Sequence, residues 1–276
     1  MIDLLKKILQ PKPARKLLQA IATEKNDLTK ELLENGYSAN AIDETGQHVL
    51  FSVMANNTNT RLAIVELLLA YGADVNCRRA DGCTPVFLAR GEVLQLLLAN
   101  QANVIVKNNQ GATPLHFATD VEEAKVLVDL GLNINERDNE HNSILHNSMY
   151  GSYELVKYCL ESGADVHAQN QKGWTPLTSL ARTEKVMEQD KLADIIAKAE
   201  LLLEAGADIN VLDYRKWTIS DHAIFVNNNP FAIWLRTMQR PYGARTLHKG
   251  KSLERWTSAT GSYNNRLPGN DGLCME

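Results

Sequence analysis

Histidine and cysteine are the residues of this sequence that could bind a metal ion or carry a nucleophilic reaction. The chain contains seven histidines and four cysteines. His141 with His146, or Cys77 with Cys83, stand close enough in sequence to form ligand pairs. A structural zinc site takes four ligands, and neither pair has a second pair at a usable spacing. The sequence therefore predicts no metal site.

Motifs for catalysis or phosphate binding are also missing from the sequence. Cys159 lies on the apolar stripe of an expected helix, where a thiol acts as a small core residue. The sequence contains no Gly-rich phosphate loop, no Gly-x-Ser-x-Gly elbow and no His-Glu-x-x-His. We therefore expect a protein that is not an enzyme and that binds no cofactor.

Composition excludes two further classes of protein. With 276 residues, 44% of them hydrophobic and 22% charged, the chain is too apolar to be wholly disordered. No apolar run approaches the roughly 20 residues of a membrane span, so we expect no membrane partner. Residues 1–10 have an acid at position 3 and no small-residue cleavage site, which makes a poor secretory signal. The scattered cysteines fit a reducing compartment, and the expected location is the cytoplasm.

An internal repeat organises the elements that must position these side chains. A turn anchor, usually a glycine, recurs at Gly36, Gly72, Gln101, Gly131, Gly163 and Gly206. A second anchor follows ten residues after each of these, at Gly46, Gly82, Gly111, His141, Gly173 and Lys216. Both series advance by 36, 29, 30, 32 and 43 residues, so the connector between the anchors never changes in length. A constant connector beside variable neighbours predicts a rigid structural unit.

The variable stretch between connectors predicts two helices. Segments 64–69 and 93–98 place apolar residues at helical spacing and end shortly before an anchor, where a residue in the left-handed conformation caps a helix. The pairs Thr84-Pro85 and Thr113-Pro114 are suited to open the first helix, because threonine caps helices well and proline is tolerated at the first helical position.

These residues resemble the ankyrin repeat, whose period is about 33 residues and whose signature includes the tetrapeptide found at 113–116, Thr-Pro-Leu-His. The resemblance covers roughly residues 14–240. It implies an all-α solenoid of about seven helix-loop-helix units with β-turn fingers, including a first unit at about 14–42 and a last at about 213–240. It also implies that His116 and His146 hydrogen-bond the neighbouring turn.

Several departures from the repeat pattern carry structural expectations. The third and fourth units are short, so segments 88–93 and 119–122 must form tight turns between helices. The sixth unit is about ten residues longer, and segment 185–192 should extend a helix or a loop. His141 and Lys216 stand where glycine usually takes a positive φ. The second helix of the last unit should start at Pro230.

The resemblance implies recognition of another protein through the fingers and inner helices of a concave surface. In this register the C-terminal units concentrate Trp, Tyr and Arg, the residues most enriched in interface hot spots. We predict the partner site on the concave face of the last three units. The predicted partner-binding residues are Arg137, Glu140, Asn142, Tyr150, Lys172, Trp174, Arg182, Tyr214, Arg215 and Trp217. The alternative is that Trp174 and Trp217 simply pack on the next finger.

Both ends of the chain differ from the repeats. Residues 1–13 predict an amphipathic segment, for which the alternatives are a cover for the first unit or a docking role. Residues 241–276 predict a basic, flexible tail with five Lys and Arg against three Asp and Glu, a net charge of +2 beside −6 for the remainder. The acidic body argues against nucleic acid as a partner, and the tail is too short for a catalytic domain of its own.

We expect a non-enzymatic interaction module that acts as an adaptor or an inhibitor, as a monomer. The irregular repeat lengths and the high asparagine content resemble ankyrin proteins of bacteria, including secreted host-directed effectors and toxin-neutralising proteins. An effector would be delivered into a host cell. The alternative function is an effector that recruits or carries an enzymatic activity through its C-terminal tail.

Overall fold

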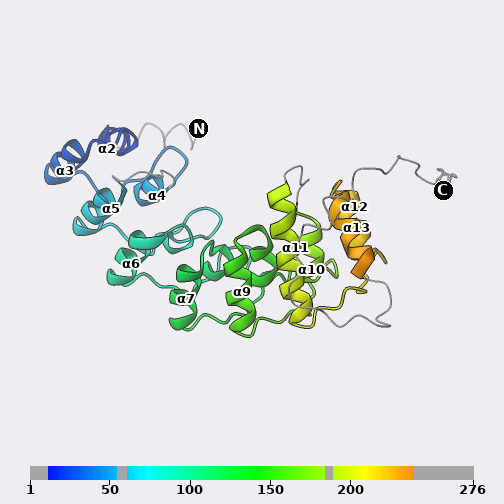
Figure 1. The fold of residues 1–276 in the computed structure, drawn as a ribbon. Helices are drawn as coiled ribbons and strands as arrows, with labels where there is room; N and C mark the ends of the chain where they lie inside the picture. Colours follow the sequence, from blue (N-terminus) through cyan, green and yellow to red (C-terminus); the bar gives the residue numbers. More distant parts are fainter. Residues whose placement is uncertain (1–11, 55–60, 184–188, 239–276) are drawn as a thin grey trace. The chain divides into compact units, whose positions relative to one another are not determined.

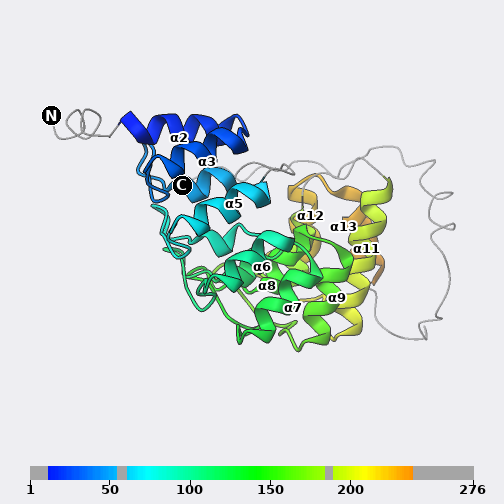
Figure 2. The same ribbon diagram turned by 90° about the vertical axis from the view of Figure 1, so that its left-hand side faces the viewer.

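The computed structural model describes residues 12–54, 61–183 and 189–238 of the chain. Within these ranges the chain forms seven successive pairs of helical elements, and in every pair after the first the first element is shorter than the second helix (Figures 1 and 2). The described ranges contain no strand, and Ile42 and His48 form an isolated antiparallel bridge. The predicted all-α solenoid is therefore confirmed.

The paired elements follow one another in chain order. We call each pair, together with the finger that precedes it, a unit, and the first two elements belong to unit one. The elements are α2 (Lys12–Ala22), α3 (Asn26–Glu34), α4 (Val49–Met54), α5 (Arg61–Ala70), η1 (Pro85–Phe87), α6 (Gly91–Ala99), η2 (Pro114–Phe117), α7 (Val121–Asp129), α8 (Ile144–Asn147) with η3 (Ser148–Tyr150), α9 (Tyr153–Glu161), α10 (Pro176–Ala181), α11 (Gln189–Glu204), α12 (Ile219–Phe225) and α13 (Asn229–Met238).

The first elements of units three and four are shorter than the sequence predicts. A helix is expected in each, but η1 and η2 are single 3₁₀ turns. These units span only 29 and 30 residues, and the connector and the nine-residue second helix leave room for little more than one turn. Tight turns come after η1 and η2, as expected, and the second helices α6 and α7 begin at Gly91 and Val121.

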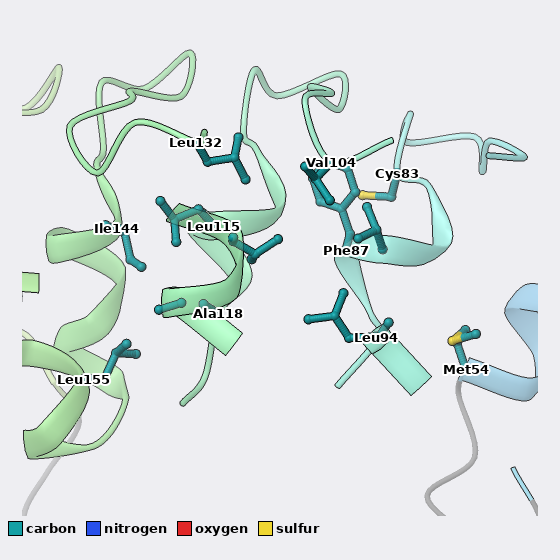
Figure 3. Packing of buried hydrophobic residues seen from close by; sticks show 14 of the residues in the cluster. Met54, Cys83, Phe87, Leu94, Val104, Leu115, Ala118, Leu132, Ile144 and Leu155 are labelled. Carbon is teal, nitrogen blue, oxygen red and sulfur yellow. The ribbon is translucent and has the colours of Figure 1, made fainter. Parts of the chain in front are cut away.

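Buried apolar side chains form layers between neighbouring units (Figure 3). Phe87 and Leu94 of unit three lie near Leu115 of unit four, and each is at most 2% exposed. Cys159 is fully buried on α9, as its place on an apolar stripe predicts. Because each layer is shared by adjacent units, interfaces between neighbours supply the stability of such a solenoid.

The ten-residue connectors contain fingers with a common hydrogen-bond pattern. In five of the six fingers, an Asp or Asn three residues before the second anchor accepts the backbone N–H groups two and four positions later through its Oδ1 atom. These residues are Asp43, Asn108, Asp138, Asn170 and Asp213. The second anchor takes a positive φ, which is 65° for both His141 and Lys216, as predicted. This self-contained turn explains why the connector has a constant length.

Hydrogen bonds also connect successive fingers. The backbone N–H of Asn109 donates to the carbonyl of Asp81 (2.9 Å), and Asn139 and Tyr214 make equivalent bonds to the fingers before them. The side-chain amide of Asn109 donates to the carbonyl of Ala80 (2.9 Å). The finger tips are therefore held in a continuous ladder across these units.

Three asparagine side chains form a second set of links between units. The Nδ2 of Asn135 donates to the carbonyl of Gly163 (3.0 Å), and its Oδ1 accepts the N–H of Asp165 (2.7 Å) in the next unit. Asn40 and Asn76 make the same two-point clamp to the units after them. Asparagine suits this position because its amide combines two donors with an acceptor.

Parts of three predicted segments lie outside the described residues. These are residues 1–11 of the N-terminal segment, residues 185–188 of the long sixth unit, and the tail at 241–276. The last helix begins at Asn229, one residue before the predicted Pro230. Within the described ranges, no helix is long and apolar enough to cross a membrane.

Candidate protein-interaction surface

Two histidines that could have served chemistry instead join neighbouring units. The Nδ1 of His116 accepts the N–H of Thr113 (3.1 Å), so Nε2 carries the proton and donates to the carbonyl of Asn142 in the next finger (3.1 Å). His146 makes the same link to the carbonyl of Trp174 (3.1 Å). Burial lowers the pKa of both imidazoles, which keeps them neutral. Their predicted bond to the neighbouring turn is confirmed.

The described cysteines are unsuited to nucleophilic chemistry. Cys77, Cys83 and Cys159 are buried and carry free thiols. Burial raises the pKa of Cys77 and of Cys159 to about 12, so both stay protonated near neutral pH. Across the described ranges, no three His, Cys, Asp or Glu side chains are grouped to hold a metal ion.

We define the inner face as the face formed by the fingers and the first elements. On this face, units six and seven bring together aromatic rings, an arginine and a histidine. Helix α10 packs against α12, and the finger that precedes α12 lies beside them. We call the group on this face the C-terminal aromatic cluster. It consists of Trp174, Arg182, Trp217, His222 and Phe225.

Arg182, at the end of α10, lies between two aromatic rings. Its guanidinium carbon is 4.3 Å from the centre of the Trp174 ring and 5.4 Å from that of Phe225. Such contacts attract a cation to the negative face of a ring. Lys172 also lies over Trp174, at 4.8 Å. The two cations therefore share one aromatic platform.

The imidazole of His222 and the buried carboxylate of Asp213 hold Arg182 in position. The Nη1 of Arg182 donates to Nδ1 of His222 (3.0 Å), since a guanidinium has no acceptor. His222 must then carry its proton on Nε2, which donates to Oδ2 of Asp213 (3.1 Å). Burial lowers the pKa of His222, so the imidazole is neutral and tolerates the neighbouring cation.

The Asp213 carboxylate is fixed by four N–H donors. Its Oδ1 accepts the backbone N–H groups of Arg215 (2.7 Å) and Trp217 (2.9 Å). Its Oδ2 accepts Nε1 of Trp174 (3.3 Å) and Nε2 of His222 (3.1 Å). Although burial acts in the opposite direction, these hydrogen bonds leave the pKa of Asp213 below its usual value. Asp213 is thus a structural anion rather than an open acidic group.

Both predicted tryptophans are only partly exposed. Trp174 lies against the next finger through its bond to Asp213, as the alternative reading of the sequence expects. The Trp217 ring packs against His222 and Phe225, with centroids 5.3 and 5.4 Å apart. These two side chains support the cluster, while its exposed area comes from Phe225, which is 61% exposed.

The structure separates the other predicted residues into two groups. Tyr150 and Tyr214 are 68% and 66% exposed, and Glu140, Lys172 and Arg215 are also exposed.

Arg137 and Asn142, by contrast, already have partners within the solenoid. Arg137 donates to the carbonyl of Gln169 (3.0 Å) and lies 3.5 Å from a carboxylate oxygen of Asp165. Asn142 bonds both the carboxylate of Asp138 and the amide of Asn170. Their polar groups hold fingers together and are less available to a partner.

Sequence reasoning did not include Asp213, His222 or Phe225 in the partner site. His222 stands one position after the usual histidine of the repeat motif, and Asp221 takes the capping position instead. That shift turns the imidazole toward Asp213, nine residues earlier. The displaced histidine and the exposed aromatic at the end of the same helix were the available signals.

A shallow groove of about 770 Å³ also lies over the second helices α5, α6 and α7. Its floor includes Leu62 and Val126, and its rim includes Glu92, Asp120 and Glu122. These acids lie at the starts of α6 and α7, where negative charge stabilises a helix. Helix capping accounts for this acidic rim.

Stacked helix pairs joined by linked fingers define a repeat solenoid, a class that presents an extended surface to other proteins. The family description "Ankyrin repeats (3 copies)" matches residues 17–104, 52–138 and 89–170, which together cover more than half of the chain. The chain belongs to the ankyrin repeat family, and its repeats mark it as a protein–protein interaction module.

Two curated relatives come from Acanthamoeba polyphaga mimivirus. The chain is 32% identical to "Putative ankyrin repeat protein L91" over 192 residues, which cover 65% of this chain and 26% of that protein. It is 42% identical to "Putative ankyrin repeat protein R886" over 52 residues, which cover 19% of this chain and 38% of that protein. The matches thus span well under half of either relative's length.

The fold is also similar to the crystal structure of the human ASB11 ankyrin repeat domain. The TM-score is 0.64 at 24% sequence identity, over 80% of this chain and 96% of that domain. At this identity the likeness shows the fold alone.

Proposed function

We propose that this chain is a non-enzymatic adaptor or inhibitor that binds another protein on the inner face of units five to seven. The observation that carries the proposal is the exposure of three aromatic side chains on the fingers and first elements of these units. Tyr150, Tyr214 and Phe225 are each more than 60% exposed, and Phe225 lies against the stacked Arg182. Large exposed apolar groups of this kind mark interaction sites.

The composition of this face favours a protein partner. Tyr, Trp and Arg are enriched among residues that carry most of the binding energy at interfaces. Trp174 and Trp217 fix the cluster from below, so little side-chain freedom is lost when a partner binds. The proposal includes a monomeric protein in the cytoplasm, with neither a membrane nor nucleic acid as its partner.

Site-specific photo-crosslinking tests where the partner binds. A photoreactive phenylalanine analogue replaces Tyr150 or Tyr214 on the inner face, and Glu66 or Lys125 on the second helices serves as the control position. We expect both inner-face positions to label the same protein in cells that make the chain, and the control positions to label it weakly or not at all. Labelling from the control positions alone would place the partner on the opposite face.

Alanine variants then measure how much the exposed rings contribute. Truncating Trp174 or Trp217 would also disturb the fold, because their rings pack inside the cluster. Tyr214→Ala with Phe225→Ala removes two rings that are each more than 60% exposed and should weaken partner binding by at least roughly tenfold, with circular dichroism to check that the fold is intact. Ile105→Ala, on an equally exposed side chain of unit four, is the matched control and should leave the affinity unchanged.

A further inference from the structure

Arg182 keeps most of its hydrogen-bonding capacity free for a partner. A guanidinium has five N–H donors, and among the described residues Arg182 makes a single hydrogen bond, to Nδ1 of His222. Among the described residues, no carboxylate forms an ion pair with it. Asp213, the nearest acid in the same network, is committed to four other donors.

The surroundings of Arg182 hold its guanidinium in one orientation. The Trp174 ring lies against the group at 4.3 Å, and Phe225 is within 5.4 Å. His222, itself anchored on buried Asp213, receives one N–H in the plane of the guanidinium. An arginine ordered in this way loses little conformational entropy on binding a planar anion, and its parallel N–H groups match the two oxygens of a carboxylate.

Charge on the same face also favours an anion. Lys172 is exposed and lies over the same Trp174 ring as Arg182, and Arg215 and Lys216 are exposed on the next finger. None of these three cations forms an ion pair among the described residues, whereas Lys107 on an earlier finger pairs with Glu136 (2.5 Å). The last two fingers therefore present unpaired cations on a body whose residues 1–240 carry a net charge of −6.

We propose that Arg182 is the specificity-determining residue of the inner face and that it binds the carboxylate of an Asp or Glu in an acidic segment of the partner. The apolar groups beside that carboxylate pack on Phe225 and Tyr214. Lys172 and Arg215 attract neighbouring acids. This inference rests on the proposed function, because it names the chemistry of the partner that the same face binds.

Defined peptide libraries test the inference on the purified full-length chain. One library of twelve-residue peptides has Glu fixed at the centre and random flanking residues, and the second has Gln at that position. We expect the Glu library to bind at least tenfold more strongly, and the difference to shrink as the salt concentration rises. Equal binding of the two libraries, or no binding of either, overturns the proposal.

Variants of Arg182 separate recognition from folding. Arg182→Met should abolish the preference for Glu, while Arg182→Lys keeps the charge, loses the planar fork and should retain only part of the preference. Lys125→Met removes a cation from α7 and is the matched control. Circular dichroism and the Tm of each variant report whether the fold is intact. A preference for Glu that survives in folded Arg182→Met overturns the proposal.

The crosslinking experiment keeps this inference distinct from the proposed function. If Tyr150 and Tyr214 positions label one partner but Arg182→Met leaves its affinity unchanged, the inner face is the binding site and the carboxylate assignment is wrong. If the inner-face positions label nothing that the control positions do not, the proposed function itself is wrong.

Discussion

Asparagine acts in this protein as a link between units. Asn40, Asn76 and Asn135 occupy the same place in three units, and each clamps the loop of the next unit with its amide. Ile105 and His167 stand at this place in units four and six, where the clamp is missing. Two of the junctions therefore lack a pair of hydrogen bonds that their neighbours have.

Replacing Ile105 should supply one missing clamp. In Ile105→Asn the new amide would reach the carbonyl of Gly131 and the N–H of Asn133, by analogy with Asn76. Ile105 is 69% exposed, so little buried apolar area is lost. We expect a gain of about 1 kcal/mol in the free energy of unfolding, measured by urea denaturation.

The matching loss is tested at Asn135. Asn135→Ala removes both bonds to unit six and should cost about 1–2 kcal/mol. Asn210→Ala changes an exposed asparagine at the same place in unit seven, without a clamp, and should cost much less. Equal losses in these two variants would show that the clamp does not stabilise the junction.

Two glycines with the same backbone conformation should respond differently to alanine. Gly173 and Gly163 have φ values of 75° and 82°. A Cβ atom at Gly173 would lie 2.8 Å from Cδ1 and 2.9 Å from N of Tyr214, whereas one at Gly163 meets nothing within 4 Å. Both substitutions strain the backbone by about 1–2 kcal/mol. Gly173→Ala should cost roughly 1–3 kcal/mol more, because it also pushes the last finger away.

At the scale of elements, polar side chains that are largely buried connect neighbouring units. Arg90, in the turn before α6, lies 2.7 Å from the carboxylate of Glu123 on α7 and donates to the carbonyl of Phe117 (2.7 Å). Glu123 also accepts the N–H of Thr119 (3.1 Å). Lys198 on α11 likewise donates to the carbonyl of Gly151 (2.5 Å) in the preceding unit. These cations satisfy carbonyls at the ends of short first elements, which longer helices would bond internally.

Glu123 should give the fold a distinct dependence on pH. Burial raises its pKa to about 7, although Arg90 acts in the opposite direction, and its ordinary value is 4.5. Between these values the folded chain holds a proton that the unfolded chain has lost, so the stabilisation from Glu123 is complete below pH 4.5 and lost as the pH rises through 7.

The variant Glu123→Gln isolates this contribution. Glutamine does not titrate, so the variant lacks the loss of stability that Glu123 causes in the parent as the pH rises from 5 to 7. The free energy of unfolding of the variant minus that of the parent should therefore increase over this range. The difference should approach roughly 1 kcal/mol per pH unit. Urea denaturation across this range measures it. Glu122→Gln, on the exposed side of the same helix, controls for the loss of a charge, and parallel curves for Glu123→Gln and the parent would contradict the raised pKa.

At the scale of the whole molecule, stability is divided among neighbouring interfaces. The main contacts join elements of one unit or of adjacent units, such as α10 with α12 and α9 with α11. Among the described residues, the buried hydrophobic side chains form one core that continues from unit to unit, and aliphatic residues supply most of it in a chain with only 6% aromatic residues. Changes in distant units should then act independently.

Double variants test this independence. Asn40→Ala and Asn135→Ala break clamps at junctions far apart in the chain, and their losses should add to within about 0.5 kcal/mol. Asn135→Ala with Arg137→Met is the contrasting pair, because both side chains contact Asp165. That pair should deviate from additivity by more than about 0.5 kcal/mol. Coupling between the distant pair would indicate a structure that is more cooperative than a solenoid.

The sequence by itself determined the number of units, the places of the turns and the apolar face of each second helix. These features depend on short-range order: a positive φ at the anchors, an Asp or Asn that caps its own turn, and apolar residues at helical spacing. It was therefore possible to predict the positive φ of His141 and Lys216 from the sequence, whereas the links made by His116 and His146 were expected from the resemblance to the ankyrin repeat.

Only the tertiary structure decided which of the predicted partner residues have partners within the solenoid. Arg137 and Asn142 both bond the neighbouring finger. Arg182 meets His222 across 40 residues of chain, and Trp174 meets Asp213 across 39. Such contacts depend on how one unit stacks on the next, and no periodicity within a unit records that stacking.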